Sequence, residues 1–286
     1  MTDADAARSP EAAFSLLSNE TRFAILRALY DADERSLSFS DLRERTGVRD
    51  SGQFNYHLGK LVGVFVREVD DGYALRYAGK QVIGAVLSGA YTRELTVDPV
   101  PVDANCFECG ASLAATYRNE RARVGCTECD LSVTEYGVPP GLVEGYDRED
   151  LPHVFDRWIR TQMSQQFAGF CERCLGRIRT TMDDDPDPEL GVPGLSHECD
   201  RCSFSSVSVV GAAVIDHPAV VAFHHDHGVD LRETPLWDLD WLVSDRHELL
   251  STDPPRVRVV IPLGDEELRV DVDADATVDG YERRSA

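Results

Sequence analysis

Hydrophobic side chains recur at helical spacing along the first 61 residues. Residues 11–30 predict a short helix followed by a longer one, and residues 40–47 predict another short helix that Gly47 ends. Residues 51–61 place hydrophobic side chains at i, i+4 and i+7: Phe54, Leu58 and Leu61. This third stretch therefore predicts a helix that buries one face.

A period-two pattern follows these helices. Residues 66–78 alternate between hydrophobic and polar types on both sides of Asp71 and Gly72, a favourable two-residue turn, and so predict a β-hairpin. Helix, short helix, turn, helix and hairpin form a winged helix-turn-helix, which we predict for residues 1–95. The hydrophobic face of the next helix, residues 77–92, packs either on its own domain or on a second copy of the chain, and the pattern alone favours neither.

The middle of the chain predicts a linker and a helix. Pro99 and Pro101 indicate a stiff linker over residues 96–105. Residues 146–170 predict a connecting amphipathic helix. Its hydrophobic side consists of Val154, Phe155, Trp158, Ile159 and Met163.

The C-terminal residues predict a small α+β region. Residues 205–215 indicate a strand, and residues 218–228 indicate a helix that Gly228 ends. Alternation on both sides of Gly264 predicts a second hairpin, and residues 276–286 are expected to be loose. The fold class predicted for the whole chain is therefore α+β.

All eight cysteines occur in four Cys-x-x-Cys pairs. The pairs are Cys106 with Cys109, Cys126 with Cys129, Cys171 with Cys174, and Cys199 with Cys202. Two thiolates at this spacing bind one tetrahedral ion from a single turn, and two such turns supply the four ligands of a structural Zn²⁺. Neighbouring pairs should combine, because closing a shorter loop costs less entropy. We predict two structural Zn²⁺ sites in zinc-ribbon modules, the first at 106–145 and the second within 171–286, with no ligand position open for catalysis.

Disulfides and redox dithiols are the alternatives to zinc. Disulfides need an oxidising compartment, and the start MTDADAARSPEAAF lacks the basic and apolar stretches of a signal peptide. A redox dithiol usually occurs as one pair at the head of a helix, whereas these pairs recur in twos. Zinc binding stays open for the second set, because the loop from Cys174 to Cys199 is longer and contains an acidic run broken by prolines.

The formal charge of -22 is distributed unevenly. The chain has 27 arginines but only two lysines, Lys60 and Lys80, among 51 acidic residues. Such acid-rich, lysine-poor surfaces look like those of extreme halophiles, where carboxylates keep a protein soluble in concentrated salt. Residues 1–95 hold 12 basic and 14 acidic residues and are nearly neutral. A domain that binds a polyanion such as DNA needs this nearly neutral net charge, since like charges repel.

Two motifs carry a resemblance to a known family. The stretch LSNETRFAILRALYD and the S-x-x-x-x-x-HL-x-x-L run from Ser51 to Leu61 resemble the arsenical-repressor (ArsR) family, and more closely the ArsR-like regulators common in haloarchaea. The resemblance covers about the first 95 residues and implies DNA binding, with the helix at 77–92 as a dimer interface. Metal-sensing members carry cysteines in this domain. The present chain has none before Cys106, so heavy-metal sensing there is not implied.

The helix at 51–61 is the predicted recognition helix. With its hydrophobic side buried, the residues left to face a major groove are Ser51, Gln53, Asn55, Tyr56 and Lys60. The predicted phosphate anchors are Arg43, Arg45, Arg49, Arg67 and Arg76. The alternative is that these are solvated residues of a winged helix that binds protein.

We therefore predict a sequence-specific transcriptional regulator that binds double-stranded DNA as a dimer, acts in the cytoplasm and is not an enzyme. Its C-terminal half would receive a signal or a partner. One alternative is a basal transcription component that contacts polymerase, because a winged helix joined to a zinc ribbon looks like the archaeal initiation factor TFE. A second is a metal-dependent enzyme that uses His224, His225 and His227, although the dipole at a helix C-terminus also favours histidines. No membrane association is expected, because the longest apolar stretch, 207–215, is far shorter than the roughly 20 residues of a spanning helix.

Overall fold

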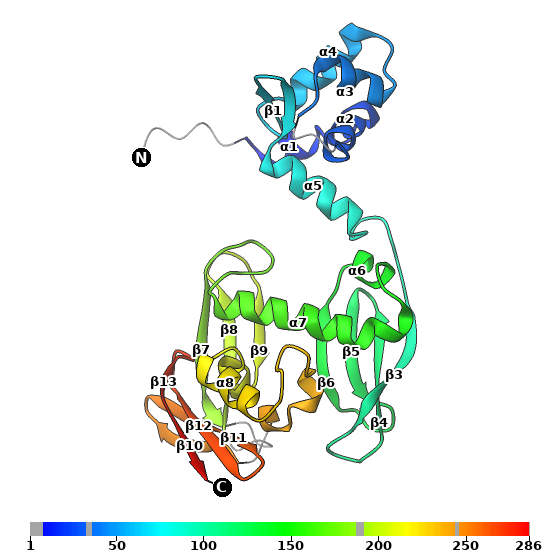
Figure 1. Cartoon of the computed structure of the whole chain (residues 1–286). Helices are drawn as coiled ribbons and strands as arrows, with labels where there is room; N and C mark the ends of the chain where they lie inside the picture. Colours follow the sequence, from blue (N-terminus) through cyan, green and yellow to red (C-terminus); the bar gives the residue numbers. More distant parts are fainter. Residues whose placement is uncertain (1–7, 33–35, 187–191, 244–245, 286) are drawn as a thin grey trace. The chain divides into compact units, whose positions relative to one another are not determined.

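A computed structural model describes residues 8–32, 36–186, 192–243 and 246–285 (Figure 1). The chain divides into two compact units. Unit 1 comprises the residues up to Glu94 together with Pro139–Glu144, and unit 2 comprises Leu95–Val138 and Gly145–Ala286. Both units combine helices with antiparallel strands, which confirms the mixed α+β class.

Unit 1 consists of helices and one hairpin. Its elements are α1 (Pro10–Phe14), α2 (Glu20–Tyr30), α3 (Phe39–Thr46), α4 (Ser51–Leu61), β1 (Val66–Val69), β2 (Gly72–Leu75), α5 (Tyr77–Leu87) and α6 (Pro140–Glu144). Side chains that accept backbone N–H groups begin four of the helices: Ser9 for α1, Asn19 for α2, Ser38 for α3 and Asp50 for α4. Gly47 ends α3 with a φ of 70°, as the sequence predicts.

One hydrophobic core holds these elements together. Its fully buried members include Ile25, Leu42, Phe54, Leu58 and Ile83, which come from α2, α3, α4 and α5. The hairpin joins the core through a bridge between Leu37 and Tyr73. At Gly72 a Cβ atom would lie 2.1 Å from the carbonyl oxygen of Leu37, so only glycine permits this close approach.

Unit 2 contains three antiparallel sheets. The first has the order β3 (Val97–Asn105), β4 (Ser112–Arg118), β5 (Arg121–Cys126), β6 (Ser132–Gly137). The second has the order β7 (Ile178–Pro186), β8 (Pro193–Cys199), β9 (Ser205–Ser208). The third has the order β10 (Glu248–Thr252), β11 (Pro255–Leu263), β12 (Glu266–Val272), β13 (Val278–Ser285). Residues 187–191, in the long acidic loop between the second pair of cysteine turns, lie outside the described residues.

Helix α7 (Leu151–Phe167) contacts strands of the first two sheets. On the first sheet, the ring of Phe155 stacks on that of Tyr117 with 6.3 Å between centroids, and the fully buried Tyr117 hydroxyl donates to the carbonyl of Val138 at 2.9 Å. Burial raises the pKa of Tyr117 to about 12, so it stays protonated and keeps this hydrogen bond. The first sheet, α7 and the second sheet, which the sequence predicts as three separate modules, belong to one compact unit.

A buried ion pair fixes the other side of α7. Arg160 contacts Asp156 at 3.0 Å and donates to the carbonyl of Leu231 at 3.1 Å, while Asp156 accepts the backbone N–H of Leu236 at 2.8 Å. Burial is the main influence on Asp156 and raises its pKa. The loop that follows helix α8 (Pro218–Asp226) is thereby attached to α7.

Three local predictions were wrong. The predicted linker at 96–105 is largely strand β3, in which Pro99 and Pro101 are tolerated because β3 is an edge strand and leaves their positions exposed. The predicted strand at 205–215 is a strand only to Ser208, and a 3₁₀ helix follows at Val210–Val214. The predicted loose end forms β13, which pairs with β12.

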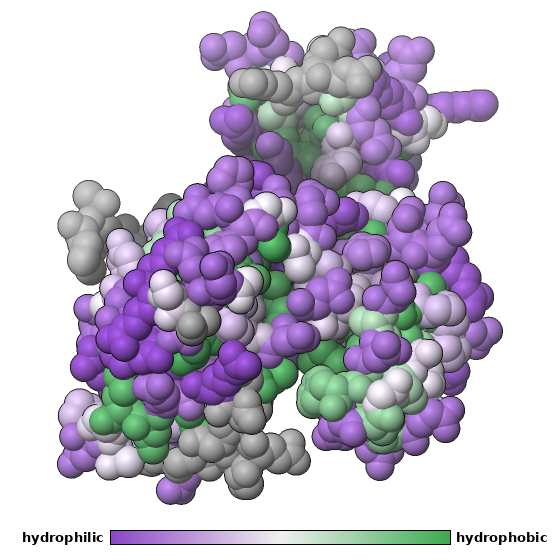
Figure 2. Space-filling model, turned by 60° about the horizontal axis from the view of Figure 1, so that its bottom comes forward, coloured by the Kyte–Doolittle hydropathy of each residue, from purple (hydrophilic) through white to green (hydrophobic). Residues whose placement is uncertain are grey.

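The largest core of unit 2 lies between the second and third sheets and α8. Its members include Leu195, Val214, Phe223, Trp241 and Ile261. Hydrophilic residues cover most of the face drawn in Figure 2, with smaller hydrophobic patches between them, as the acidic composition leads one to expect. None of the described helices is long and apolar enough to cross a membrane.

Two buried histidines in unit 2 make its stability depend on pH. The indole N–H of Trp241 donates to Nε2 of His224 at 3.2 Å, and Nδ1 of His224 contacts the carbonyl oxygen of Val220 at 2.8 Å, so the ring fits its site only when neutral. Burial lowers the pKa of His224, and burial likewise lowers that of His197.

We expect unit 2 to lose stability as the pH falls below about 6.5, the ordinary pKa of histidine. The unfolded chain then binds protons that the folded chain excludes, so the free energy of unfolding decreases. Thermal unfolding from pH 8 to pH 5 checks this, with His224→Gln compared with the exposed neighbour variant His225→Gln. The slope of Tm against pH should decrease in His224→Gln and stay unchanged in His225→Gln; equal slopes in all three proteins would contradict the assignment.

Candidate metal centres and the exposed face of helix α4

Four sulfur atoms converge at one end of the first sheet, in a cluster that we call centre 1. The Sγ atoms of Cys106 and Cys129 are 3.6 Å apart, and those of Cys109 and Cys126 are 3.4 Å apart. The sequence prediction that neighbouring pairs combine is thus confirmed for centre 1.

Centre 2 lies at the end of the second sheet and has the same design. Its Sγ atoms are 3.8 Å apart between Cys171 and Cys202, and 3.5 Å apart between Cys174 and Cys199. The longer loop therefore did not prevent these four cysteines from converging. Among the described residues, centres 1 and 2 are the groups of His, Cys, Asp and Glu placed to hold a metal ion.

The sulfur spacing fits a metal better than a disulfide. A disulfide requires sulfur atoms about 2.05 Å apart, whereas a Zn²⁺ ion with Zn–S bonds of about 2.3 Å in a tetrahedron places its ligands about 3.8 Å apart. All eight cysteines are free of disulfides, and the observed separations of 3.4 to 3.8 Å lie near the tetrahedral value. Each centre can therefore hold one metal ion.

The turns that carry the cysteines match between the two centres. In centre 1 the N–H of Gly110 donates to the carbonyl of Cys106 at 2.9 Å. In centre 2 the N–H of Leu175 donates to the carbonyl of Cys171 at the same distance. The residue after the second cysteine is left-handed in both turns, with φ of 77° at Gly110 and 55° at Leu175.

Backbone N–H groups stabilise one thiolate in each centre. In centre 1 the N–H groups of Cys129 and Glu128 donate to Sγ of Cys126 and lower its pKa to about 6. In centre 2 the N–H of Arg201 plays this part for Cys199, whose pKa also falls to about 6. A thiolate is the form that binds metal, so these N–H groups prepare one ligand of each centre. Burial and the neighbouring thiols raise the pKa of Cys129 in centre 1 and of Cys174 in centre 2, so these ligands ionise when a metal ion binds.

A polar network that the sequence did not indicate joins centre 2 to the first sheet. Tyr136 of β6 donates its hydroxyl hydrogen to Glu172, which lies between the first two cysteines of centre 2. The buried Gln166 of α7 donates to Glu172 at 3.2 Å and accepts from Ser206 at 3.0 Å. These residues are scattered along the sequence without a shared motif, so no pattern could have grouped them.

The predicted recognition helix exposes the polar residues that the sequence selects. Ser51, Gln53, Asn55, Tyr56 and Lys60 are all exposed on α4, and the Tyr56 side chain is 59% exposed. The opposite side of α4 is buried through Phe54, His57, Leu58 and Leu61. The Lys60 ammonium lies 5.4 Å from the centre of the Tyr56 ring, so these two neighbours form a cation–π pair.

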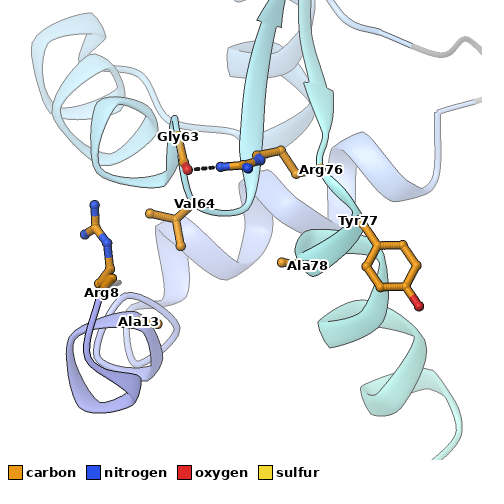
Figure 3. A pocket seen from close by; sticks show the side chains of 7 residues that line it. All are labelled: Arg8, Ala13, Gly63, Val64, Arg76, Tyr77 and Ala78. Atoms are coloured by element: carbon orange, nitrogen blue, oxygen red, sulfur yellow. Dashed lines mark hydrogen bonds between the residues drawn. The ribbon is translucent and has the colours of Figure 1, made fainter. Parts of the chain in front are cut away.

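The predicted phosphate anchors lie around this helix and on the hairpin. Arg45 and Arg49 are exposed and Arg43 is half-buried, all three at or just beyond the C-terminal end of α3, while Arg67 is exposed on β1. Arg76 differs, because its guanidinium donates to the carbonyl of Gly63 (Figure 3).

A pocket of about 380 Å³ lies beside this hydrogen bond. Figure 3 shows its lining, which consists of Arg8, Ala13, Gly63, Val64, Arg76, Tyr77 and Ala78. The pocket contains two arginines and no carboxylate, so its lining favours an anion over a cation.

The histidine segment does not converge on a site. His224 is 1% exposed and has both ring nitrogens in contact with partners inside the core. His225 is exposed, and His227 contacts the carbonyl of Phe223 and the carboxylate of Glu266. The three side chains therefore have separate surroundings, which argues against their sharing a metal.

Comparison with protein families matches both units. The family model DUF7351, described as a domain of unknown function, matches residues 103–278. The chain belongs to the DUF7351 family. A second model, DUF7347, also a domain of unknown function, matches residues 10–86 and thus α1 to most of α5. No curated protein and no solved structure matches the chain. The DUF7351 match includes both centres, α7 and strands β10 to β12 of the third sheet, in agreement with their packing as one unit.

The residue after the second cysteine of each matched turn has a positive φ, and its substitution should change metal affinity in opposite directions in the two centres of this DUF7351 domain. Gly110→Ala should weaken metal binding at centre 1 by about 1 kcal/mol, or about fivefold, because a Cβ atom disfavours positive φ. No neighbour lies within 4 Å of the added Cβ atom, so the cost is conformational. Leu175→Gly at the matched turn should strengthen binding at centre 2 by up to about the same amount. Competition with a chromophoric chelator measures both affinities, and a weakening in Leu175→Gly would refute the shared turn.

Proposed function

We propose that this protein is a sequence-specific transcriptional regulator that binds double-stranded DNA through a winged helix-turn-helix in unit 1. The main support is helix α4, which buries one side and presents five polar side chains on the other. Amide groups such as those of Gln53 and Asn55 can form paired hydrogen bonds with adenine in a major groove. The order of α2, α3, α4 and the hairpin β1–β2 is the order expected for a winged helix-turn-helix, in which α4 would be the helix that enters the major groove.

Charge also supports DNA as the ligand. Residues 1–95 carry nearly equal numbers of acidic and basic residues, while the rest of the chain carries almost all of the net charge of -22. Exposed arginines at the end of α3 and on the hairpin lie on segments next to α4 in sequence, where DNA phosphates would be contacted. The resemblance to ArsR-like regulators agrees with this assignment and suggests a dimer formed through α5, whose Leu87 remains partly exposed.

We further propose that both centres bind Zn²⁺ as a structural ion. Four cysteine ligands in a near-tetrahedral arrangement fill the coordination of zinc and leave no position for substrate. Among the described residues, the small core at centre 2 has three buried members, Cys171, Ile178 and Phe204, so metal binding would supply much of what holds this end of the sheet together.

The two lysines of the chain provide a matched test of the DNA interface. Lys60→Ala, on α4, should lower affinity for a duplex selected by the protein from genomic fragments, and should reduce the slope of log K against log salt by about 0.9 if one phosphate contact is lost. Lys80→Ala, on α5, should change neither quantity. Fluorescence anisotropy at several KCl concentrations measures both, and equal effects of the two variants would remove the basis for α4 as the DNA-binding helix.

Base recognition is tested separately. Gln53→Ala and Asn55→Ala should each reduce the free energy of binding to the selected duplex by about 1 to 3 kcal/mol, and the free energy of binding to a scrambled duplex by much less. Pull-down of polymerase subunits by the same proteins distinguishes the TFE-like alternative. Strong polymerase capture combined with no preference among duplexes would favour that alternative over a regulator.

Removal of zinc should affect the units differently. A strong chelator should unfold the ends of the first two sheets and lower the Tm of unit 2, while unit 1, which contains no cysteine, keeps its melting transition. Metal analysis of the purified protein should give two zinc ions per chain, as the two cysteine clusters require. A chelated protein that retains both transitions unchanged would refute the structural role.

A further inference from the structure

The two metal centres carry opposite charges at equivalent positions. The third residue of each Cys-x-x-Cys turn is Glu108 and Glu128 in centre 1, but Arg173 and Arg201 in centre 2. Hydrogen bonds establish the equivalence, because the backbone N–H of Glu128 reaches Sγ of Cys126 at 3.3 Å and that of Arg201 reaches Sγ of Cys199 at 3.4 Å. The two centres have the same turn geometry but opposite charges at these positions, which indicates that they face different partners.

The arginines of centre 2 are available for a ligand. Arg173, Arg177 and Arg201 are exposed, and none forms an ion pair with another described residue. The Arg173 guanidinium lies over the Phe204 ring, 4.9 Å from its centre, and this contact leaves its charge without a carboxylate partner. Their neighbour Arg179, in contrast, pairs with Asp200 at 3.1 Å. Three exposed guanidinium groups without a carboxylate partner among the described residues thus lie close in sequence to the cysteines of centre 2, in a part of the chain whose overall charge is strongly negative.

Exposed hydrophobic side chains accompany these charges. Phe170 is 56% exposed and forms a β-bridge with Arg177, and Leu175 is 58% exposed within the metal-binding turn itself. The backbone N–H of Asp200 bonds to the carbonyl of Arg177 at 3.0 Å, which brings the turn that carries Arg201 beside Arg177. We call Phe170, Arg173, Leu175, Arg177 and Arg201 the basic tip.

We propose that the basic tip binds single-stranded nucleic acid. Guanidinium groups bind phosphates, and an exposed phenyl ring offers a surface on which an unpaired base stacks, which is the combination that single-strand binding requires. A closed duplex presents phosphates but no free base faces, so it would leave Phe170 and Leu175 without partners. This function is additional to the duplex recognition proposed for α4 and does not depend on it.

Anisotropy of a labelled oligo-dT strand with the full-length, zinc-loaded protein tests the proposal. Arg173→Glu/Arg201→Glu, which gives centre 2 the charges of centre 1, should weaken binding at least tenfold. Phe170→Ala should weaken it about tenfold through loss of stacking. The control Arg118→Glu/Arg157→Glu changes two exposed arginines of unit 2 and the net charge equally, and should have little effect.

Zinc content, measured for each variant, shows whether centre 2 is intact. Equal losses of oligo-dT affinity in the two double variants would mean that binding depends only on net charge, and would overturn the proposal. So would binding of a duplex of dA and dT strands through the basic tip as tightly as the single strand. Lys60→Ala should leave oligo-dT binding unchanged while it weakens duplex binding, so a failure of the basic tip is distinguishable from a failure of α4.

Discussion

Four thiol groups within 4.8 Å of one another are the constraint on which each ribbon depends. Sulfur atoms this close repel one another once they are ionised, yet the backbone N–H groups around Cys126 and Cys199 favour ionisation. A cation resolves this conflict, because it attracts all four thiolates and holds two distant turns together. Strands β4 and β5 of the first sheet, and β7 and β8 of the second, begin or end beside these turns, so a bound ion would hold the ends of these strand pairs together.

Helix α7 joins the first two sheets into one domain. Phe155 packs on the first sheet, Gln166 bonds to residues of the second ribbon, and the pair of Asp156 and Arg160 holds the loop beyond α8. A buried pair of this kind contributes little net stability, but loss of either member leaves an uncompensated charge in the core. The DUF7351 family model covers all of these elements, which fits a domain that cannot be divided without exposing the helix.

Much of the site could be predicted from the sequence because it depends on local rules. Cysteine spacing identified both centres, and the positions of Phe54, Leu58 and Leu61 identified the buried face of α4 and hence its exposed residues. The errors arose where tertiary pairing overrode local signals. Pro99 and Pro101 indicate a linker until β4 supplies a partner for an edge strand, and residues 278–285 appear too polar for a strand until β12 lies beside them. The choice of partner strand depends on distant residues, so periodicity cannot disclose it.

The hydrogen bonds among Tyr136, Gln166 and Glu172 couple centre 2 to the first sheet. Glu172 is held between two ligands of centre 2, and Tyr136 belongs to the edge strand of the other ribbon. Oxidation or emptying of the second cluster would release Glu172, and the Tyr136 hydroxyl would then lose its acceptor in a half-buried position. Loss of the metal at centre 2 would therefore also remove a hydrogen bond of the first sheet, so its effect would extend beyond the second cluster.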